Sequence, residues 1–386
     1  MRARFLPFSE PLVGEEEIAS VVECLRSGWL TTGAKVREFE QDFAAYVGCQ
    51  HALAVNSCTA ALHLALEAVG VGPGDEVITC PMTFTATAAV IEHLGASPAL
   101  VDCERSTLNL DPAQIEARIT PRTRAILPIH FGGQACEMDE ILRIAHAHGL
   151  PVIEDAAHAL PTRYRGRMIG TLGDITCFSF YATKTLTTGE GGMAVTERAD
   201  LADRMRLMHL HGMSRDAWKR YTQNGSWSYE ILAPGYKYNL TDIAASIGIH
   251  QLRRAEAFHA RRREIARRYN EALSGLRGIE VPEVRDEAGH AWHLYVLRLV
   301  PGALTLDRDT FIARLVAMNI GVSVHFIPLH LHPYYRDKYG FAPTDFPNAY
   351  EAFQGIVSLP IYPKMTDDDV QDVIDAVRTL VEEHQR

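Results

Sequence analysis

Short apolar runs alternate with helical patterns between residues 51 and 195, and this alternation constrains the fold more than any other feature. Each run is rich in apolar residues, and each intervening segment repeats apolar residues at helical spacing. The runs are 52–55, 77–79, 99–101, 125–129, 152–154, 176–180 and 192–196, and the helical segments are 59–69, 85–94, 112–119 and 138–148. Strands separated by helices pair mostly in parallel, with helices on both faces of the sheet. The sequence therefore predicts an α/β fold with a mostly parallel sheet.

The second half of the chain predicts a smaller α/β domain. At 386 residues the chain exceeds the usual size of a single core. A long helical pattern runs from Thr241, whose hydroxyl can cap it, to Leu273. Strands are expected at 292–299 and 322–325, helices at 309–318 and 367–383, and a joint at Gly275–Gly289. We predict an N-terminal arm and large domain over residues 1–250, and a bridging helix and small domain over residues 251–386.

Composition narrows the class of protein. The net charge of −10 argues against a general nucleic-acid binder, which would carry a basic face. The seven cysteines are odd in number and form no C-x-x-C, and no metal-binding spacing occurs. No apolar stretch is long enough to span a bilayer, and Pro7 and Glu10 come too early for a signal peptide. We expect a soluble, cytoplasmic protein with reduced thiols, no metal, and no nucleic-acid or membrane partner.

Two polar residues follow neighbouring predicted strands. Asp155 comes after the apolar run 150–153, and Lys184 comes just past the run 176–180. Ligands in α/β folds bind beyond the carboxyl ends of the strands. An acid and a lysine there suit pyridoxal phosphate (PLP), which needs a lysine for its Schiff base and a carboxylate opposite its pyridine nitrogen. A helix cap or a salt bridge explains Asp155 equally well, and most lysines are merely solvated.

Other residues in this part of the chain suit an anionic ligand. Asn56–Ala61 joins a strand to a helix, where free N–H groups and the helix dipole attract phosphate. Ser179 is a further hydroxyl donor, and His158 can stack on a cofactor ring or hydrogen-bond to it. A simple N-cap and a core histidine remain the plain alternatives. No G-x-G-x-x-G follows the first strand, which argues against a dinucleotide-binding dehydrogenase.

A set of motifs in a fixed order carries a family resemblance. They are Ser27–Gly33, Asn56–Ala61, Pro81–Thr87, Glu154–Ala159, Phe178–Lys184, Glu190–Gly192, Pro234–Asp242, His332–Tyr335 and Leu359–Pro360. In order and spacing the chain resembles, nearly end to end, the sugar aminotransferases of the DegT/DnrJ type. These are a branch of the aspartate-aminotransferase-like (fold type I) PLP enzymes. The resemblance implies a large domain with a mostly parallel seven-stranded sheet, plus a smaller C-terminal α/β domain.

The resemblance also implies roles for single residues. Lys184 is the expected Schiff-base lysine and Asp155 the partner of the pyridine nitrogen, with His158 beside the cofactor, where many relatives carry Gln. The remaining cofactor contacts implied are Thr59, Ala60 and Ser179 on the phosphate, Phe84 stacked on the ring, and Asn239 on the phosphate of the other subunit. The protein is therefore expected to be a homodimer with its active sites at the interface.

For the reaction, the resemblance implies transfer of an amino group from glutamate to a nucleotide-linked keto sugar, giving an amino sugar nucleotide and 2-oxoglutarate. Within the family, Phe5–Ser9, Ala291–Leu294 and Val324–Phe326 resemble the UDP-4-amino-4-deoxy-L-arabinose–oxoglutarate aminotransferases, which favours a UDP-4-keto sugar. A dTDP- or GDP-linked 3- or 4-keto sugar is the alternative. The substrate-side candidates are Trp29, Thr31, Tyr236, Lys237 and His325, and Lys237, Arg215 and Arg220 are candidates for the anionic groups. His325 can equally be a packing residue.

The same residues argue against two alternative functions within the family, a sugar dehydratase and a PLP-binding regulatory protein. Sugar dehydratases of this type replace the Schiff-base lysine with histidine, whereas position 184 is lysine here. A PLP-binding regulatory protein needs no complete catalytic set, so Lys184, Asp155 and the phosphate loop together argue against that reading.

Overall fold

The structure, a computed structural model, describes residues 2–214, 228–286 and 289–386. Within these residues, one sheet orders its strands β3-β2-β4-β5-β8-β9-β1, because bridges 126–152 and 129–155 join β4 to β5. The strands are β1 His51–Val55, β2 Glu76–Thr79, β3 Ser97–Leu100, β4 Thr123–Leu127, β5 Ile153–Asp155, β8 Ile175–Ser179 and β9 Gly192–Thr196. Only β9 runs antiparallel to its neighbours in this sheet. The expected mostly parallel, seven-stranded sheet is confirmed.

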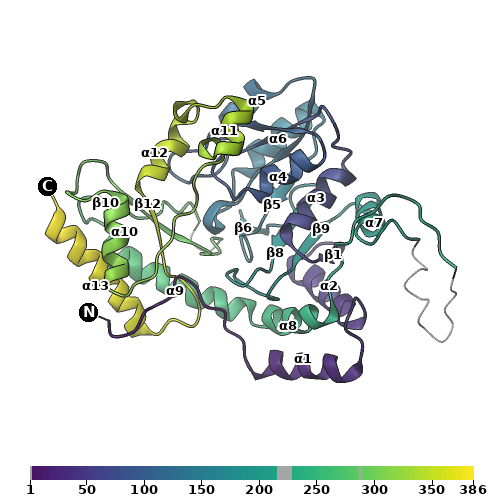
Figure 1. Cartoon of the computed structure of the whole chain (residues 1–386), viewed down its shortest axis with the longest axis horizontal. Coiled ribbons are helices and arrows are strands. Elements are labelled where there is room, and N and C mark those ends of the chain that lie inside the picture. The colour runs from purple at the N-terminus through teal and green to yellow at the C-terminus, as the bar shows by residue number, and fades with distance from the viewer. Residues whose placement is uncertain (1, 215–227, 287–288) are drawn as a thin grey trace.

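Helices cover both faces of the seven-stranded sheet (Figure 1). Alternate residues of one strand enter different cores: Ala52 and Ala54 join one hydrophobic cluster, Leu53 and Val55 the other. The surrounding helices are α1 Glu15–Ser27, α2 Ala34–Val47, α3 Cys58–Ala68, α4 Ala86–His93, α5 Ile115–Arg118, α6 Met138–His148 and α7 Ala199–Met208. A hairpin of β6 Arg163–Tyr164 and β7 Arg167–Met168 follows β5. Burial on both faces explains why the strands read as continuous apolar runs.

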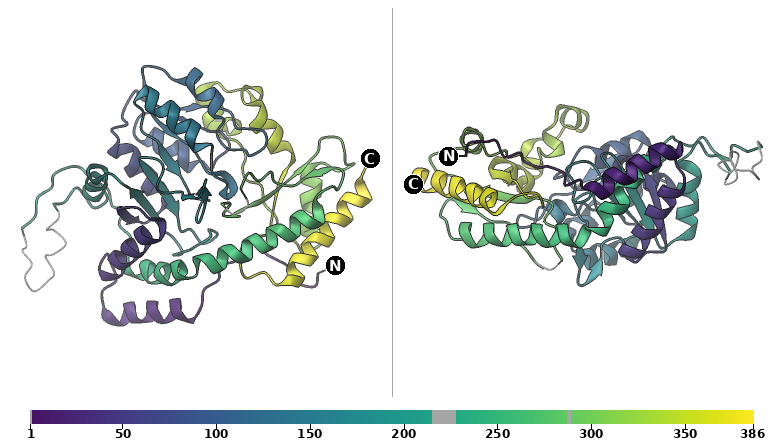
Figure 2. Two further views of the ribbon diagram at one scale, coloured as in Figure 1. Left: turned by 180° about the vertical axis from the view of Figure 1, so that it is seen from behind. Right: turned by 90° about the horizontal axis from the view of Figure 1, so that it is seen from below.

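The expected helix from Thr241 to Leu273 is two helices. The first helix is α8 Asp242–Arg253. Thr241 caps it, as the sequence predicts, because the amide of Ala244 donates a hydrogen bond to Thr241 Oγ1 at 3.2 Å. It ends at Arg254, and α9 Ala255–Leu273 continues from there. The guanidinium of Arg254 donates to the carbonyl of Leu12 and pairs with Glu17, so the N-terminal segment holds the residue at the break. Figure 2 shows α8 and α9 running along one side of the molecule.

A second, antiparallel sheet orders its strands β10-β11-β12. Its strands are β10 Ile279–Glu280, β11 Tyr295–Leu299 and β12 Ile356–Leu359. The helices α10 Arg308–Ala317, α11 Pro333–Tyr339 and α12 Pro347–Gly355 come between β11 and β12, and α13 Asp367–His384 follows β12. Its core includes Leu6, whereas Tyr335 and Phe346 pack into the core of the seven-stranded sheet. The strand expected at 322–325 is wrong: only Ser323 pairs there, in an isolated bridge to Ser358. The domain division at residue 250 stays a prediction.

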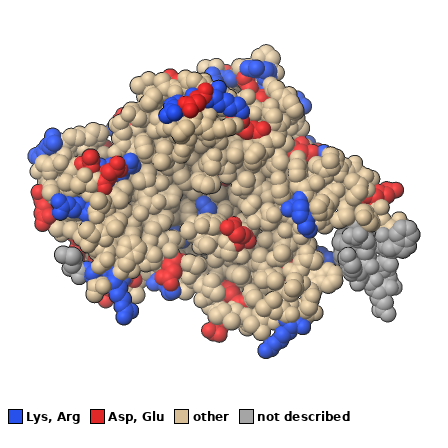
Figure 3. All heavy atoms as spheres, in the orientation of Figure 1, with Lys and Arg blue, Asp and Glu red and all other residues tan. Residues whose placement is uncertain are grey.

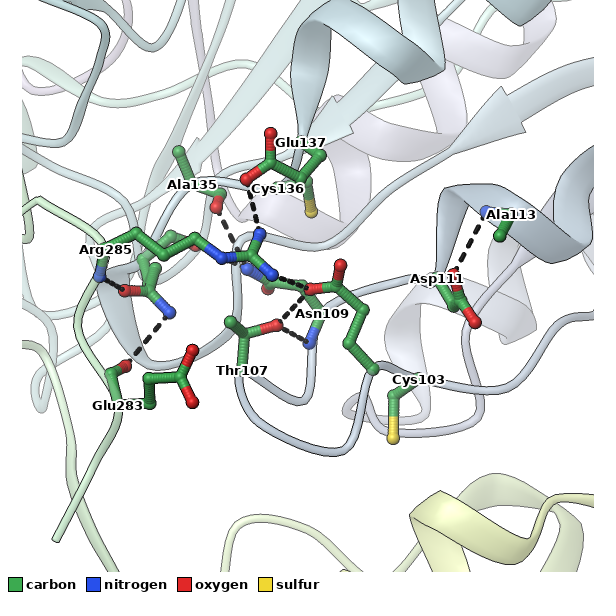
Figure 4. Close-up of polar contacts among 12 residues, drawn as sticks. Cys103, Thr107, Asn109, Asp111, Ala113, Ala135, Cys136, Glu137, Glu283 and Arg285 are labelled. Carbon is green, nitrogen blue, oxygen red and sulfur yellow. Dashed lines mark hydrogen bonds and ion pairs between the residues drawn. The ribbon is translucent and has the colours of Figure 1, made fainter.

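The turn after β4 joins the two sheets. The amides of Ala291 and Leu294 donate to the carbonyls of Gly133 and Gly132 at 2.9 and 3.0 Å. Nearby, Arg285 forms ion pairs with Glu104 and Glu137, and Figure 4 shows its guanidinium reaching Glu137. These contacts hold the segment before β11 against the carboxyl edge of the seven-stranded sheet.

The surface carries charges of both signs. On the face drawn in Figure 3, blue and red side chains are interspersed rather than gathered into one patch. No helix in the described part of the chain is long and apolar enough to cross a membrane.

Candidate active site

A cavity of about 450 Å³ opens at the carboxyl ends of β5 and β8. It brings together many of the residues predicted for a cofactor site: Thr59, Phe84, Asp155, His158, Ser179, Lys184 and His325. Phe8, His293 and Phe326 also line it. A cavity of about 490 Å³ lies between the loop 105–108 and β11, but it holds no predicted site residue. Among the described residues, no group of three or more potential ligands is arranged to hold a metal ion.

Asp155 lies at the end of β5 and is 5% exposed. Its Oδ2 accepts a hydrogen bond from Thr87 Oγ1 at 2.8 Å, and its Oδ1 accepts one from the amide of Ala157 at 3.1 Å. Burial raises the pKa of this carboxyl, and these hydrogen bonds and Lys184 oppose the rise. In the described part of the chain its hydrogen-bond partners are a hydroxyl and an amide rather than an arginine, so the salt-bridge alternative finds no support. A buried carboxylate facing a cavity suits a cationic ring nitrogen.

Lys184 lies in the turn after β8, where its amide donates to the carbonyl of Tyr181 at 2.9 Å. Burial lowers the pKa of its amine to about 8, and the nearby Cys58 and Asp155 oppose that change. An amine with such a pKa is partly uncharged near neutral pH and can act as a nucleophile. This lysine is therefore no ordinary solvated side chain.

The N-terminus of α3 meets the cavity at Ser57, Cys58 and Thr59. Ser57 Oγ accepts from the amide of Ala60 at 3.1 Å, so the N-cap is real, and Ala60 itself does not line the cavity. A Cβ on Gly192 would lie 2.6 Å from the Cys58 nitrogen, so glycine is needed for β9 to pass this close. Together with Ser179, which also lines the cavity, this backbone suits a phosphate group.

His158 is packed among other rings. The ring centroid of His293 is 4.4 Å from that of His158, Phe326 stacks on His158 at 5.7 Å, and the edge of Phe131 lies at 6.4 Å. The amide of Gly132 donates to Nδ1 of His158 at 3.3 Å, so the neutral ring carries its proton on Nε2. Burial, with Lys184 nearby, holds the pKa of His158 well below its usual range. His158 is therefore a neutral ring whose N–H donor is at Nε2.

The outer wall carries aromatic rings. Phe84 is 61% exposed although it lines the cavity, so its face is open to a ligand. His325 stacks on Phe8 at 5.3 Å, and its Nδ1 is hydrogen-bonded to Ser358 Oγ at 2.8 Å. Burial lowers the pKa of His325 to about 4. His325 thus both packs against the arm and borders the cavity.

Several predicted site residues lie elsewhere. Trp29, Thr31, Tyr236, Lys237 and Asn239 do not line this cavity of the single chain. The side-chain amide of Asn239 donates to Thr32 Oγ1 at 2.7 Å, and Trp29 Nε1 donates to the carbonyl of Thr32 at 3.1 Å. Arg215 and Arg220 lie outside the described residues. The roles of all these residues stay predictions.

Sequence reasoning missed four contributors: Thr87, Phe8, His293 and Phe326. All four residues fall inside motifs of the family resemblance, but the sequence pattern predicted no site role for any of them. Of the four, Thr87 was the easiest to predict. It lies in the first turn of α4, the helix after β2, where a side chain can face the same sheet edge as Asp155.

Comparisons with known proteins agree with this geometry. Residues 11–378 match the model of the DegT/DnrJ/EryC1/StrS aminotransferase family. The chain is 56% identical over 381 residues to the spore coat polysaccharide biosynthesis protein SpsC of Bacillus subtilis (strain 168), covering 98% of each chain. Among solved structures, Spr1654 from Streptococcus pneumoniae, assigned as a sugar aminotransferase, matches in its PLP form with 36% identity and a TM-score of 0.91, covering 98% of this chain and 99% of that one. DesI, solved in the presence of its TDP-sugar product, matches with 31% identity and a TM-score of 0.87, covering 99% of this chain and 94% of that one.

Proposed function

The chain belongs to the DegT/DnrJ/EryC1/StrS aminotransferase family, and we propose that it transfers an amino group from glutamate to a UDP-linked 4-keto sugar. It is a PLP-dependent sugar aminotransferase of fold type I. The choice of sugar, nucleotide and donor is the proposal. The observation that supports the PLP-dependent chemistry is that buried Asp155 and the low-pKa amine of Lys184 line one cavity, beside the N-terminus of α3.

The residues of the cavity fit the cofactor. When bound, PLP supplies an electron sink that stabilises negative charge next to the transferred amine. Asp155 would hold a proton on the pyridine nitrogen, because a charged partner relieves its burial. Lys184 would hold the cofactor in place and, once displaced, its amine would carry the proton from the donor's α-carbon.

The remaining polar groups would orient the cofactor. Thr59, the backbone of Ala60 and Ser179 would bind the phosphate at the start of α3. The N–H at Nε2 of His158 would donate to the ring hydroxyl, since its Nδ1 is already occupied by Gly132. Phe84 would cover one face of the ring with its exposed side chain.

The substrate proposal rests on the relatives and on the outer wall. DesI was solved with a TDP-sugar product, and SpsC belongs to polysaccharide biosynthesis, which supports a nucleotide-linked sugar. His325, beside Phe8, would meet the sugar. The test is product analysis with UDP-4-ketopentose, UDP-4-keto-6-deoxy-N-acetylglucosamine and a dTDP-3-keto-6-deoxyhexose, each with glutamate. Turnover of the 3-keto sugar alone would defeat the C4 assignment, and turnover of none would defeat the substrate class.

We also propose a homodimer in which Asn239 reaches the cofactor of the partner subunit. Asn239 lies outside the cavity of its own chain, and α1 exposes the apolar residues Ile18, Val22 and Leu25 at helical spacing, as an interface would. Mixing inactive Lys184→Ala with inactive Asn239→Ala protein should restore activity, because one site of a mixed dimer is intact. Mixtures that contain heterodimers and stay inactive would place Asn239 in its own site or in none.

The seven cysteines are all free thiols, and most of them are buried. Such thiols support a reducing, cytoplasmic location.

A further inference from the structure

The backbone is strained just before β11. Trp292 has φ 51°, in the left-handed region, although its large side chain is only 2% exposed. A bulky side chain in this region is a genuine outlier, and such strain persists only where the surroundings enforce it. Strain of this kind gathers at functional sites, so what enforces it and what it presents are both informative.

Two side chains of α9 enforce the strained turn. Arg262 Nη1 donates to the carbonyls of Trp292 and His293 at 3.1 and 3.4 Å, and to that of Ile361 at 2.6 Å. His259 Nε2 donates to the carbonyl of His290 at 2.8 Å, and the amide of Trp292 donates to Nδ1 of His290 at 2.8 Å. The turn is therefore clamped on both sides of Trp292.

Arg262 holds this turn with a buried charge, and burying a charge costs free energy. It is 2% exposed, and burial lowers the pKa of its guanidinium to about 10. In the described structure its hydrogen-bond acceptors are carbonyls, no carboxylate pairs with it, and its Nε has no partner. Well-packed apolar residues are often at least as stable as buried charges, so stability alone does not call for this arginine.

The clamped turn presents His293 to the active-site cavity. His293 is 6% exposed, borders the cavity, and lies 4.4 Å from the ring of His158 at an interplanar angle of 40°. Its Nδ1 is buried with no hydrogen-bond partner in the described residues. The ring therefore contributes through its position beside His158 rather than through a hydrogen bond of that nitrogen.

We propose that His293 is a positioning residue: Arg262 holds it through the left-handed turn at Trp292, and its ring fixes the plane of His158 against the bound cofactor. At 3.3 Å, the Gly132 hydrogen bond is long and restrains the ring of His158 only weakly, and packing against His293 and Phe326 adds to this restraint. The inference rests on the role proposed above for His158.

The first experiment compares His293→Ala, His293→Phe and His293→Gln in the PLP-loaded protein, with His330→Ala as the matched control. His330 is also fully buried, has an unpartnered Nδ1 and packs on an aromatic ring, Phe346 at 4.9 Å, but lies outside the cavity. The visible circular dichroism of bound PLP reports ring orientation without any substrate. His293→Ala and His293→Gln should change this band and slow the half-reaction with glutamate about tenfold or more, whereas His293→Phe should stay within about threefold. His330→Ala should lower the melting temperature alone.

An unchanged band and rate in both His293→Ala and His293→Gln would overturn the proposal, and so would a His293→Phe protein as impaired as His293→Ala. If His293→Ala does not fold, His293→Gln carries the comparison, because it keeps most of the volume. Arg262→Met should change the dichroism band in the same direction, and a wild-type band in that variant would remove the clamp from the proposal.

The second experiment is a double-mutant cycle with His158→Ala. If His293 acts through His158, His293→Ala should slow the His158→Ala protein by less than about threefold. A loss as large as in the wild-type background would show that His293 acts by itself and would overturn the inference. A His158→Ala protein with wild-type band and rate would instead refute the role proposed for His158, which separates the failure of that proposal from the failure of this one.

Discussion

The floor and the wall of the cavity are built in different ways. The floor consists of strand ends and the turns after them. The wall consists of rings from irregular segments, Phe8, His293 and His325, held by stacking and by bonds from outside the cavity. Strand ends and their turns thus fix the reacting groups, and irregular segments shape the space above them. Changes in the floor should abolish the reaction, and changes in the wall should tune it.

The largest expected effect is at Lys184. Lys184→Ala removes the amine that holds the cofactor and moves the proton, so turnover should fall about 10⁴-fold or more. Borohydride should attach PLP irreversibly to Lys184 in the wild-type protein, as peptide mass spectrometry would detect. Lys364→Ala, at a surface lysine that pairs with Glu10, is the matched control and should keep full activity. Substantial turnover in Lys184→Ala would contradict the role of the floor.

The next effect is at Asp155. Asp155→Asn keeps the shape but cannot hold a proton on the ring nitrogen, so the rate should fall by about 10²- to 10⁴-fold. Thr87→Val removes only the 2.8 Å hydrogen bond to this carboxylate, so the rate should fall less than in Asp155→Asn. Steady-state kinetics and the absorption spectrum of bound PLP measure both. Nearly full activity in Asp155→Asn would return Asp155 to a structural role.

The floor was predictable from the sequence because its rule is local. An apolar run of four or five residues followed by a polar one indicates a buried strand end, and the ends of neighbouring parallel strands meet at one edge. Asp155, Lys184 and the phosphate loop obey this rule, and the cavity unites them. The parallel sheet itself followed from the same alternation.

The wall was not predictable in this way because its contacts are long-range. Phe8 meets His325 from the opposite end of the chain, and no periodicity links them. The segment 322–325 has the apolar pattern of a strand, but its only strand pairing is one bridge between Ser323 and Ser358. The break at Arg254 depends likewise on Leu12 and Glu17. Local patterns carry no information on such partners.

A smaller effect is expected at the wall. His325→Ala removes a ring beside the sugar but leaves the floor intact, so the KM for the keto sugar should rise about tenfold. The half-reaction with glutamate should stay within about threefold. Phe8→Ala tests the same stack from the other side and should shift the KM in the same direction. Equal losses in both half-reactions would mean that the wall supports the floor rather than selecting the sugar.

The smallest expected effect is on the pH dependence of stability, which should differ between the floor and the wall. In the protein without PLP, the pKa of Lys184 is lowered from 10.5 to about 8 and that of His325 from 6.5 to about 4. In each case the unfolded chain binds more protons between the two values, so stability rises with pH across that window. His325 should therefore add to a slope between about pH 4 and 6.5, and Lys184 to one between about pH 8 and 10.5. Urea unfolding over a pH series should show the lower slope reduced in His325→Phe and the upper slope reduced in Lys184→Met. If either variant keeps the wild-type slope in its own window, that group is not desolvated in the folded protein, and its burial does not lower its pKa.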